Sequence, residues 1–461
     1  MRAGRIKEAI PQLLDGATEA IKRGAPQSAH RALSSALASL HGEPLRDATI
    51  LLVEALQEQG RWRESLDALE ALSDLVSEER SQEVFALAAL ANAYLGTPTQ
   101  EWLAFVPRLR HIMQTCPHTP SRVRAAKAVA HATSPLRDRK LARSMLDVVD
   151  KIPLLQLDAD ASAQVGLTRA LLLFQAGDME ESYKYASAVL EELRSRGHAS
   201  TLVVQLQTGL GAIRGRQGHY EEATVHHERA LRDSALLGND TLTAQICANL
   251  ALCYGRLGRY EDQLKCAECS PTPSNDHAVV FTDIHLACSL AIANAVGGRI
   301  SKLREAIAQC EERLGSYAPH AITQSWFLWK ADALALAGLR EEAFQTATRA
   351  VHGYGLRLEC SALTGAFARW LALTCLGSDT EPQAIKLLYQ FEDQLNDYDA
   401  LDQVEILCAR AYCESALSPK NRARITSRVE LLPLPSLAPL RATRLADVID
   451  FCFSDRWHGE A

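Results

Sequence analysis

A short phrase that begins with glycine returns at a fixed interval through the middle of the chain, and it constrains the fold more than any other feature. The clearest copy is Gly218-His219-Tyr220-Glu221-Glu222-Ala223. Related phrases begin at four other glycines, Gly177, Gly258, Gly298 and Gly338, so the steps along the chain are 41, 40, 40 and 40 residues. Such regularity is typical of a repeat protein, in which every unit has the same local structure.

Each copy of the phrase predicts the end of one helix and the start of the next. Apolar residues such as Leu210 and Ile213 lead up to Gly218, and glycine can adopt the left-handed backbone conformation that ends a helix. The acidic pair that follows lies near the positive end of the next helix dipole. A small residue comes next, here Ala223, and it lets the two helices approach closely. Each unit is therefore a helical hairpin, whose apolar faces are covered only when neighbouring hairpins stack on it.

The length and composition agree with one long array of such hairpins. The chain has 461 residues, only 6% of them aromatic, and no stretch of alternating residues long enough to predict a sheet. We therefore expect an all-α solenoid of about ten helical hairpins. The repeat array should cover residues 1–420, most clearly at 160–356 and in degenerate form at 80–150, with a C-terminal capping helix and tail at 421–461.

The hairpins can be followed along the chain by their helix breakers. We expect an opening hairpin at 6–23 and 27–40, a second turn at Gly60, and two units without the phrase that divide near Gly96 and Ser134. The prolines within Cys269 to Asp276 should stop one helix early and leave a surface loop of about a dozen residues. Later helices are expected at 358–376, 382–395, 402–417 and 440–453, followed by a disordered tail at 454–461.

The repeated residues resemble the tetratricopeptide repeat. Leu210-Gly211 lies before Gly218, and Tyr220, Ala223 and Ala230 follow it, in the order leucine-glycine, aromatic, alanine that marks this family. The period of 40 is longer than the usual 34 and is similar to that of kinesin light chains and of the sensor domains of maltose-type activators. A helical repeat of the HEAT type has a similar period but lacks the glycine-aromatic-acidic turn, so it is the second choice.

The resemblance implies a right-handed α-α superhelix, in which the first helices of the hairpins line a concave groove that binds a peptide. The residues at these groove positions are mostly polar, with amides able to pair with a peptide backbone and one large ring able to cover an apolar side chain. They are Gln164, Thr168, Gln205, Thr208, Gln245, Asn249, His285, Ser289, Ser325, Trp329 and Asp332. The lysine and asparagine set by which chaperone-type members grip a C-terminal carboxylate does not occur at these positions.

Charge and hydropathy exclude several other classes of protein. The net charge is −7, with 49 basic and 56 acidic residues, which does not fit a nucleic-acid binder. No run of about 18 apolar residues predicts a membrane span, and the N-terminus shows no secretory signal. Most of the 12 cysteines lie in apolar helical stretches and are predicted to be small core residues of a cytoplasmic protein.

Candidate chemistry is sparse. Side chains of the kinds that bind zinc occur close together in one stretch, at Cys266, Cys269, His277, His285 and Cys288. Two cysteines three residues apart also occur by chance in helical repeats. His227 is predicted to pack at a helix interface, as is most of the cluster around Trp326. No phosphate loop, dinucleotide fingerprint, nucleophile elbow or HExxH sequence is present. We therefore predict no catalytic residue, no metal and no cofactor.

These observations favour a non-enzymatic scaffold or adaptor that holds a protein or peptide in its concave groove. The alternative is a regulatory sensor, in which a ligand or peptide changes the curvature of the array and controls a separate signalling or transcription complex. The convex face and the loop at 270–276 are other possible binding surfaces. An exposed terminal hairpin could also stack on a second copy of the chain and form a homo-oligomer.

Overall fold

The protein is described by a computed structural model that is entirely helical in the part it describes. The described residues are 3–72, 78–94, 104–116, 119–133, 139–152, 159–195, 201–237, 239–271, 280–314, 320–358, 363–375, 378–395 and 400–415. They form twenty-one helices and no strand, which confirms the predicted all-α class. No described helix combines the length and apolar character that are needed to cross a membrane.

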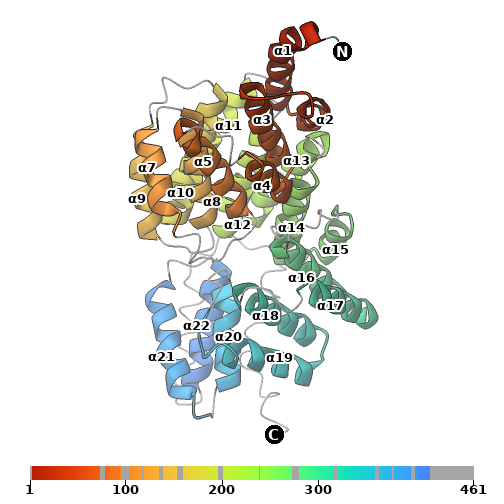
Figure 1. Cartoon of the computed structure of the whole chain (residues 1–461). Helices are drawn as coiled ribbons and strands as arrows, with labels where there is room; N and C mark the ends of the chain where they lie inside the picture. Colours follow the sequence, from red (N-terminus) through yellow and green to blue (C-terminus); the bar gives the residue numbers. More distant parts are fainter. Residues whose placement is uncertain are drawn as a thin grey trace. The chain divides into compact units, whose positions relative to one another are not determined.

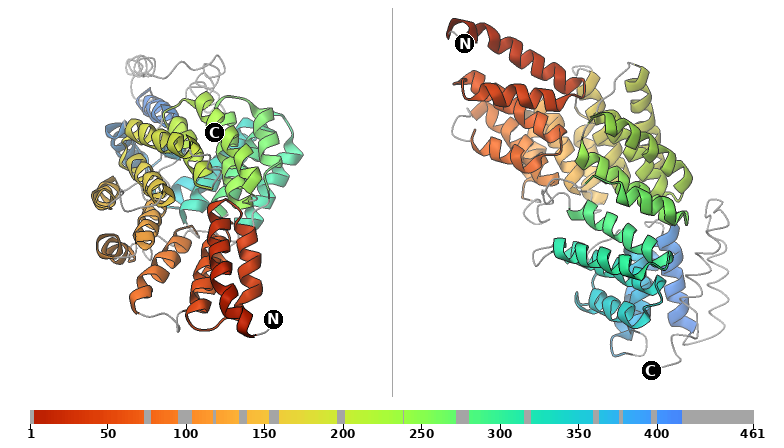
Figure 2. Two further views of the ribbon diagram at one scale, coloured as in Figure 1. Left: turned by 90° about the horizontal axis from the view of Figure 1, so that it is seen from above. Right: turned by 90° about the vertical axis from the view of Figure 1, so that its right-hand side faces the viewer.

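Many successive helices pack against each other, as α10 does against α11 and α18 against α19 (Figure 1). In chain order they are α1 (Ala3–Lys22), α2 (Pro26–Leu37), α3 (Glu43–Glu58), α4 (Trp62–Glu70), α5 (Glu78–Tyr94), α7 (Val106–Thr115), α8 (Thr119–Thr133), α9 (Arg139–Val149), α10 (Ala159–Ala176), α11 (Met179–Ser195), α12 (Thr201–Arg216), α13 (Tyr220–Leu237), α14 (Asp240–Arg256), α15 (Tyr260–Glu268), α16 (Val280–Val296), α17 (Ile300–Leu314), α18 (His320–Leu336), α19 (Arg340–His352), α20 (Thr364–Cys375), α21 (Glu381–Asp393) and α22 (Ala400–Ser415). Figure 2 shows the same hairpin arrangement from two further sides.

The glycine turn has the same geometry at each clear repeat. Gly218 has a φ of +83°, its N–H donates to the Gly215 carbonyl over 3.1 Å, and the next N–H donates five residues back to the Arg214 carbonyl over 2.9 Å. This pair of hydrogen bonds is the Schellman motif, which satisfies the last carbonyls of a helix. It recurs at Gly60, Gly177, Gly258, Gly298 and Gly338, all with positive φ. The predicted helix stop and restart are confirmed.

The helices pack closely where the sequence places small residues. Ala223 and Ala343 are fully buried, and so is Ser182, whose hydroxyl donates to the Ala170 carbonyl over 2.7 Å. At Gly211 a Cβ atom would lie 2.6 Å from the ring of His227, which is itself only 1% exposed. His227 is therefore a packing residue, as predicted. Most of the described cysteines are also buried, although Cys269 is exposed.

The chain divides into two compact units. Unit 1 contains residues 1–213, 225–246 and 270–282, and unit 2 contains residues 214–224, 247–269 and 283–461. In unit 1 the repeats that lack the glycine phrase still form a regular core, in which Leu109, Met113, Val129 and Met145 are at most 1% exposed. The stacking of hairpins therefore continues where the sequence phrase is lost.

Several predicted features can be compared directly with the helices. The helix after Gly258 is α15, which has nine residues where α13 and α11 have 18 and 17, so the predicted early stop is confirmed. The loop that follows lies mainly in residues 272–279, outside the described residues, as do the breaks near Gly96 and Ser134. The predicted helix at 440–453 and the tail also lie outside them, so the boundary at residue 420 stays a prediction.

Unit 1 contains a contact between segments that are far apart in the sequence. The side-chain amide of Asn239 donates to the Glu58 carbonyl at the end of α3, while its Oδ1 accepts from the Leu242 N–H over 2.9 Å and caps α14. A Cβ atom on Gly60, whose φ is +74°, would lie 2.6 Å from the Cβ of Thr241. The second hairpin thus touches the start of α14.

This contact predicts different results for the same substitution at two turn glycines. Gly60→Ala and Gly338→Ala both force alanine into the left-handed region, which costs about 1–2 kcal/mol, but only Gly60 faces a second segment. We expect Gly60→Ala to lower the free energy of unfolding by a further 1–3 kcal/mol or so, because Thr241 must shift. Urea titrations followed by circular dichroism measure both values.

The control is the Gly60→Ala substitution in a Thr241→Gly background, which removes the opposing Cβ. The extra destabilisation should then disappear. Equal losses for Gly60→Ala and Gly338→Ala would contradict the contact.

Candidate functional site

The exposed surface of α14 is a single narrow stripe. Between Leu242 and Arg256 most side chains are buried, and those with appreciable exposure are Gln245, Asn249, Leu252 and Arg256, together with Thr243 nearer the start of the helix. Spacings of four, three and four residues place the first four on one face of a helix. The residues 40 and 80 positions further along the sequence lie on the equivalent faces of α16 and α18.

We call the part of this surface in unit 2 the first-helix row. It is defined by equivalent positions on three successive first helices, and Gln245 lies on the same face of α14 within unit 1. The row consists of Asn249, Leu252 and Arg256 on α14, His285, Ser289, Ile292 and Val296 on α16, and Ser325, Trp329, Asp332 and Leu336 on α18.

Apolar exposure concentrates on this row. Among the described residues the exposed large apolar side chains are Val225, Leu252, Val296, Leu336 and Tyr389. Three of these five belong to the row, at 38%, 41% and 46% exposure for Leu252, Val296 and Leu336. Val296 and Leu336 occupy equivalent positions one repeat apart. Grouped apolar exposure of this kind is typical of a surface that binds a partner. The groove positions predicted from the sequence were mostly polar, and Leu252, Val296 and Leu336 were not among them.

An aromatic pair lies in the middle of the row. The rings of His285 and Trp329 meet edge to face, with centroids 4.6 Å apart and planes at 89°, so α16 and α18 are neighbours along the row. Burial lowers the pKa of His285 to about 4, which keeps its ring neutral at physiological pH. Trp329 is half-buried, whereas Ser289 and Ser325 are 4% and 1% exposed. The ring is therefore the more accessible part of this segment.

Asp332 holds two helices together. Its Oδ1 accepts from Arg369 Nη2 over 2.7 Å and from the indole Nε1 of Trp370 over 2.8 Å, which ties α18 to α20. Arg369 also lies 3.9 Å from Glu405 on α22, and the side chains of Arg369 and Glu405 are 10% and 8% exposed. Removing one partner of a buried ion pair leaves the other without compensation. Asp332 thus supports the wall of the row from which it projects.

The predicted groove positions in unit 1 present little hydrogen-bonding capacity. Thr168 is fully buried and its hydroxyl donates to the Gln164 carbonyl over 2.8 Å, while the Thr208 hydroxyl donates to the Val204 carbonyl over 2.8 Å. Both hydroxyls are thus used within their own helices. Gln164 and Gln205 are half-buried and Gln245 is exposed, so these three glutamines are the accessible members of this set.

A chain of polar side chains in unit 1 was missed by the sequence analysis. Arg194 on α11 donates to the buried Gln207 on α12 over 2.8 Å, and the Gln207 amide contacts Nδ1 of His226 on α13 over 2.6 Å. Nδ1 then accepts, so Nε2 carries the proton and donates to the Tyr183 hydroxyl over 3.2 Å. The chain connects three helices. His226 is thus part of a structural network.

A charged cluster in unit 1 was also missed. Arg124 on α8 forms ion pairs with Glu54 on α3 and with Glu83 on α5, the latter over 3.1 Å, and all three side chains are less than a quarter exposed. Lys127, one turn further on, is only 8% exposed. Burial lowers the pKa of Lys127, Glu58 opposes this, and the charge of Arg124 adds to it. These groups lie on the first helices of their hairpins. The hairpins of Glu83 and Arg124 lack the glycine phrase, so the sequence does not show that their first helices are in register with α3.

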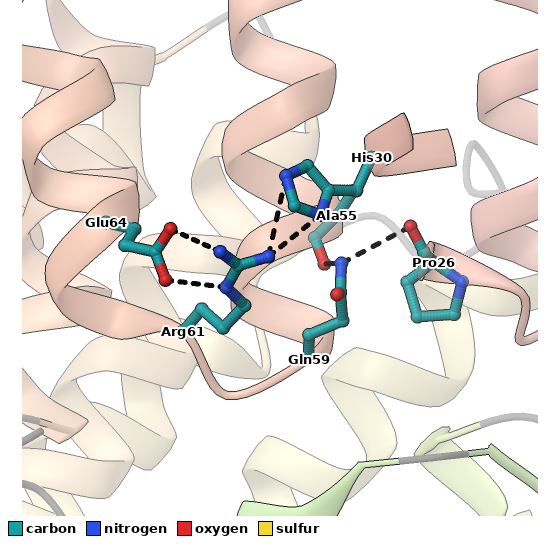
Figure 3. A network of polar contacts seen from close by, with 6 residues as sticks. All are labelled: Pro26, His30, Ala55, Gln59, Arg61 and Glu64. Carbon is teal, nitrogen blue, oxygen red and sulfur yellow. Dashed lines mark hydrogen bonds and ion pairs between the residues drawn. The ribbon is translucent and has the colours of Figure 1, made fainter. Parts of the chain in front are cut away.

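The N-terminal hairpins are joined by a separate polar network, shown in Figure 3. Arg61, in the second glycine turn, pairs with Glu64 on α4 through Nε at 2.6 Å and contacts Nδ1 of His30 on α2 at 2.9 Å. Gln59 donates to the Pro26 carbonyl over 3.3 Å and to the Ala55 carbonyl over 2.8 Å. Burial and the adjacent Arg61 lower the pKa of His30. The network fixes the stacking of the first two hairpins.

The candidate zinc ligands do not converge within the described residues. The Cys266 thiol contacts the Cys247 carbonyl over 3.4 Å, and Cys288 is buried in α16. No group of three histidine, cysteine or acidic residues able to hold a metal occurs in the described part of the chain. His277 lies outside that part.

The repeated hairpins, their Schellman turns and their buried alanines define an all-α helical repeat protein, whose hairpins resemble tetratricopeptide repeats. Neither a protein-family model nor a curated protein sequence matches the chain.

Solved structures with a similar arrangement include three helical proteins. One is a Rap protein complexed with competence and sporulation factor, at 12% identity over 96% of this chain and 99% of that chain, with a TM-score of 0.42. A second is the apo quorum sensor NprR from B. thuringiensis, at 13% identity over 77% and 99%, with a TM-score of 0.48. The third is aspartyl phosphate phosphatase F from Bacillus subtilis, at 11% identity over 93% and 96%, with a TM-score of 0.39.

The burial of His227 predicts a specific loss of stability in acid. Burial, with a smaller contribution from His226, lowers the pKa of His227 from 6.5 to about 3. The unfolded chain therefore binds a proton between these pH values that the folded chain excludes, and stability falls as the pH drops below 6.5. From pH 8 to pH 5 we expect His227 to remove on the order of 2 kcal/mol.

The measurement is a set of urea titrations between pH 8 and pH 5 for the wild type, His227→Gln and, as control, His41→Gln. His41 is exposed. The loss in acid should be smaller by about 2 kcal/mol in His227→Gln and unchanged in His41→Gln. Parallel pH dependences for all three proteins would contradict the burial of His227.

Proposed function

We propose that this protein is a non-enzymatic scaffold that binds an extended segment of a protein or peptide along the first-helix row of unit 2. The observation that carries the proposal is the exposure of Leu252, Val296 and Leu336 on one row whose surrounding side chains are mainly buried. Their removal from water by a partner's apolar side chains would supply binding free energy. The polar members of the row would then set the orientation of the partner.

The row suggests the form of its ligand. Neighbouring packed helices lie about 8–10 Å apart, and an extended chain rises by about 3.3 Å per residue. A peptide that crosses the row therefore passes from one first helix to the next in about three residues. An apolar residue at every third position of the peptide would then contact each first helix in turn. Asn249, beside Leu252, has an amide able to pair with the peptide backbone, and the ring of Trp329 offers an apolar surface.

A second candidate function is a peptide-sensing regulator of a separate effector. The continuous helix α14 supports it, because Asn239 at its start is bonded to Glu58, while Asn249 and Leu252 on its second half belong to the row. A ligand that shifted α14 would then strain the contact with the second hairpin. The curvature of unit 1 would thus depend on occupancy of the row.

The proposal predicts that charge on the row weakens ligand binding without unfolding the chain. A display library of random dodecapeptides is selected on the wild-type protein, and the affinity of the enriched peptides is measured for Leu252→Glu/Leu336→Glu. Both leucines are exposed, so the circular dichroism spectrum should not change. We expect the affinity to fall at least about ten-fold, which corresponds to about 1.4 kcal/mol.

The control is Val225→Glu, which places one such charge on a similarly exposed aliphatic residue of a second helix, α13, and it is compared with the single variants Leu252→Glu and Leu336→Glu as well as with the double variant. Val225→Glu should keep wild-type affinity, and the enriched peptides should carry apolar residues about three positions apart. Equal binding by the row variant, or the absence of any enriched peptide, would refute the proposed function.

A further inference from the structure

The sequence of the chain contains a segment with the spacing that the first-helix row requires. Residues 431–440 are Leu-Leu-Pro-Leu-Pro-Ser-Leu-Ala-Pro-Leu, with leucines at 431, 434, 437 and 440. This is one leucine at every third position, interrupted by Pro433, Pro435 and Pro439. Prolines oppose a helix and favour the polyproline II conformation.

The period of the leucines matches the period of the row. Polyproline II has three residues per turn and rises by about 3.1 Å per residue, so leucines three apart would share one face at intervals of about 9 Å. The row offers one exposed aliphatic side chain on each of three successive first helices, which are Leu252, Val296 and Leu336. Val296 and Leu336 occupy equivalent positions one repeat apart, and Leu252 lies one helical turn before the equivalent position, Arg256. The contact between the His285 and Trp329 rings shows that α16 and α18 are adjacent on the row.

The segment is also within reach of the row. The last described helix, α22, ends at Ser415, and residue 431 follows sixteen residues later in the same unit. An extended stretch of that length spans at most about 50–58 Å. Successive first helices lead from α22 by way of α20 and α18 to α16, and three steps of about 10 Å amount to roughly 30 Å. The connection is therefore longer than the path requires.

We propose that the leucine-proline segment 431–440 docks on the first-helix row of its own chain as an internal ligand, its leucines against Leu252, Val296 and Leu336. This inference rests on the proposed function, since it names an occupant of the same row. An external ligand must then displace the segment before it binds. The effective concentration of a segment tethered by a short linker is in the millimolar range, so an intrinsic Kd of about 0.1 mM would reduce external binding roughly ten-fold.

The test uses the full-length chain and a fluorescent synthetic peptide that comprises residues 430–441. The tail variant Leu434→Glu/Leu437→Glu should bind this peptide about ten times more tightly than the wild type does, because its row is vacated. The matched control is Ser436→Glu/Ala438→Glu, which adds the same charge to the same segment at positions off the leucine face. The control should bind the peptide as weakly as the wild type.

Adding Leu252→Glu/Leu336→Glu to the tail variant should abolish peptide binding and so locate the peptide on the row. Equal peptide affinity in the wild type and the tail variant, or no binding by the tail variant, would overturn the inference. If library peptides still require the row in that case, the proposed function stands and only the internal ligand is refuted.

Sedimentation of the same proteins distinguishes an internal ligand from exchange between two copies. A wild-type dimer that dissociates in Leu434→Glu/Leu437→Glu would assign the row to the segment of a second chain and would overturn the intramolecular proposal. A sedimentation coefficient that is independent of concentration in both proteins supports it.

Discussion

The left-handed glycine at the end of the first helix in every clear repeat is the constraint on which the rest of the structure depends. Its two hydrogen bonds, from the Gly218 N–H to Gly215 and from the His219 N–H to Arg214, end one helix and set the direction of the next. Because the same turn recurs every 40 residues or so, equivalent positions on successive first helices fall on one face. The row that we propose as the binding surface is a consequence of this repetition.

The sequence was a good guide to everything that depends on neighbouring residues. The helix ends, the early stop of α15 and the burial of Ala223 and His227 follow from turn chemistry and spacing within one hairpin. The same repeat spacing also predicted which positions lie on the groove side of each first helix. It could not predict how exposed those side chains are, because their exposure depends on contacts between hairpins. The Asp332 carboxylate looks available in the sequence, yet Arg369 and Trp370, which bind it, lie 37 and 38 residues further along.

The charged cluster around Arg124 is a second example of contacts between distant residues that the sequence does not reveal. Glu54 and Glu83 lie 70 and 41 residues from Arg124, and the repeats that contain Glu83 and Arg124 lack the glycine phrase, so no register connected the three in the sequence. Their pairing stabilises the stacking of first helices where local turn signals are weak. A buried charge that is held on two sides tolerates little displacement, because each partner would be left uncompensated. The cluster therefore takes over in unit 1 a role that turn chemistry fills elsewhere.

A helical repeat array buries most of each first helix, and this decides where a partner can bind. On α14 only one narrow stripe remains, and a ligand that uses more than one repeat must cross such stripes at the helix spacing rather than follow one helix. Leucines three residues apart in a proline-rich stretch meet that condition with little loss of conformational freedom on binding, because prolines already restrict the free chain. The geometry of the row thus selects ligands by the period of their apolar residues, and residues 431–440 carry that period.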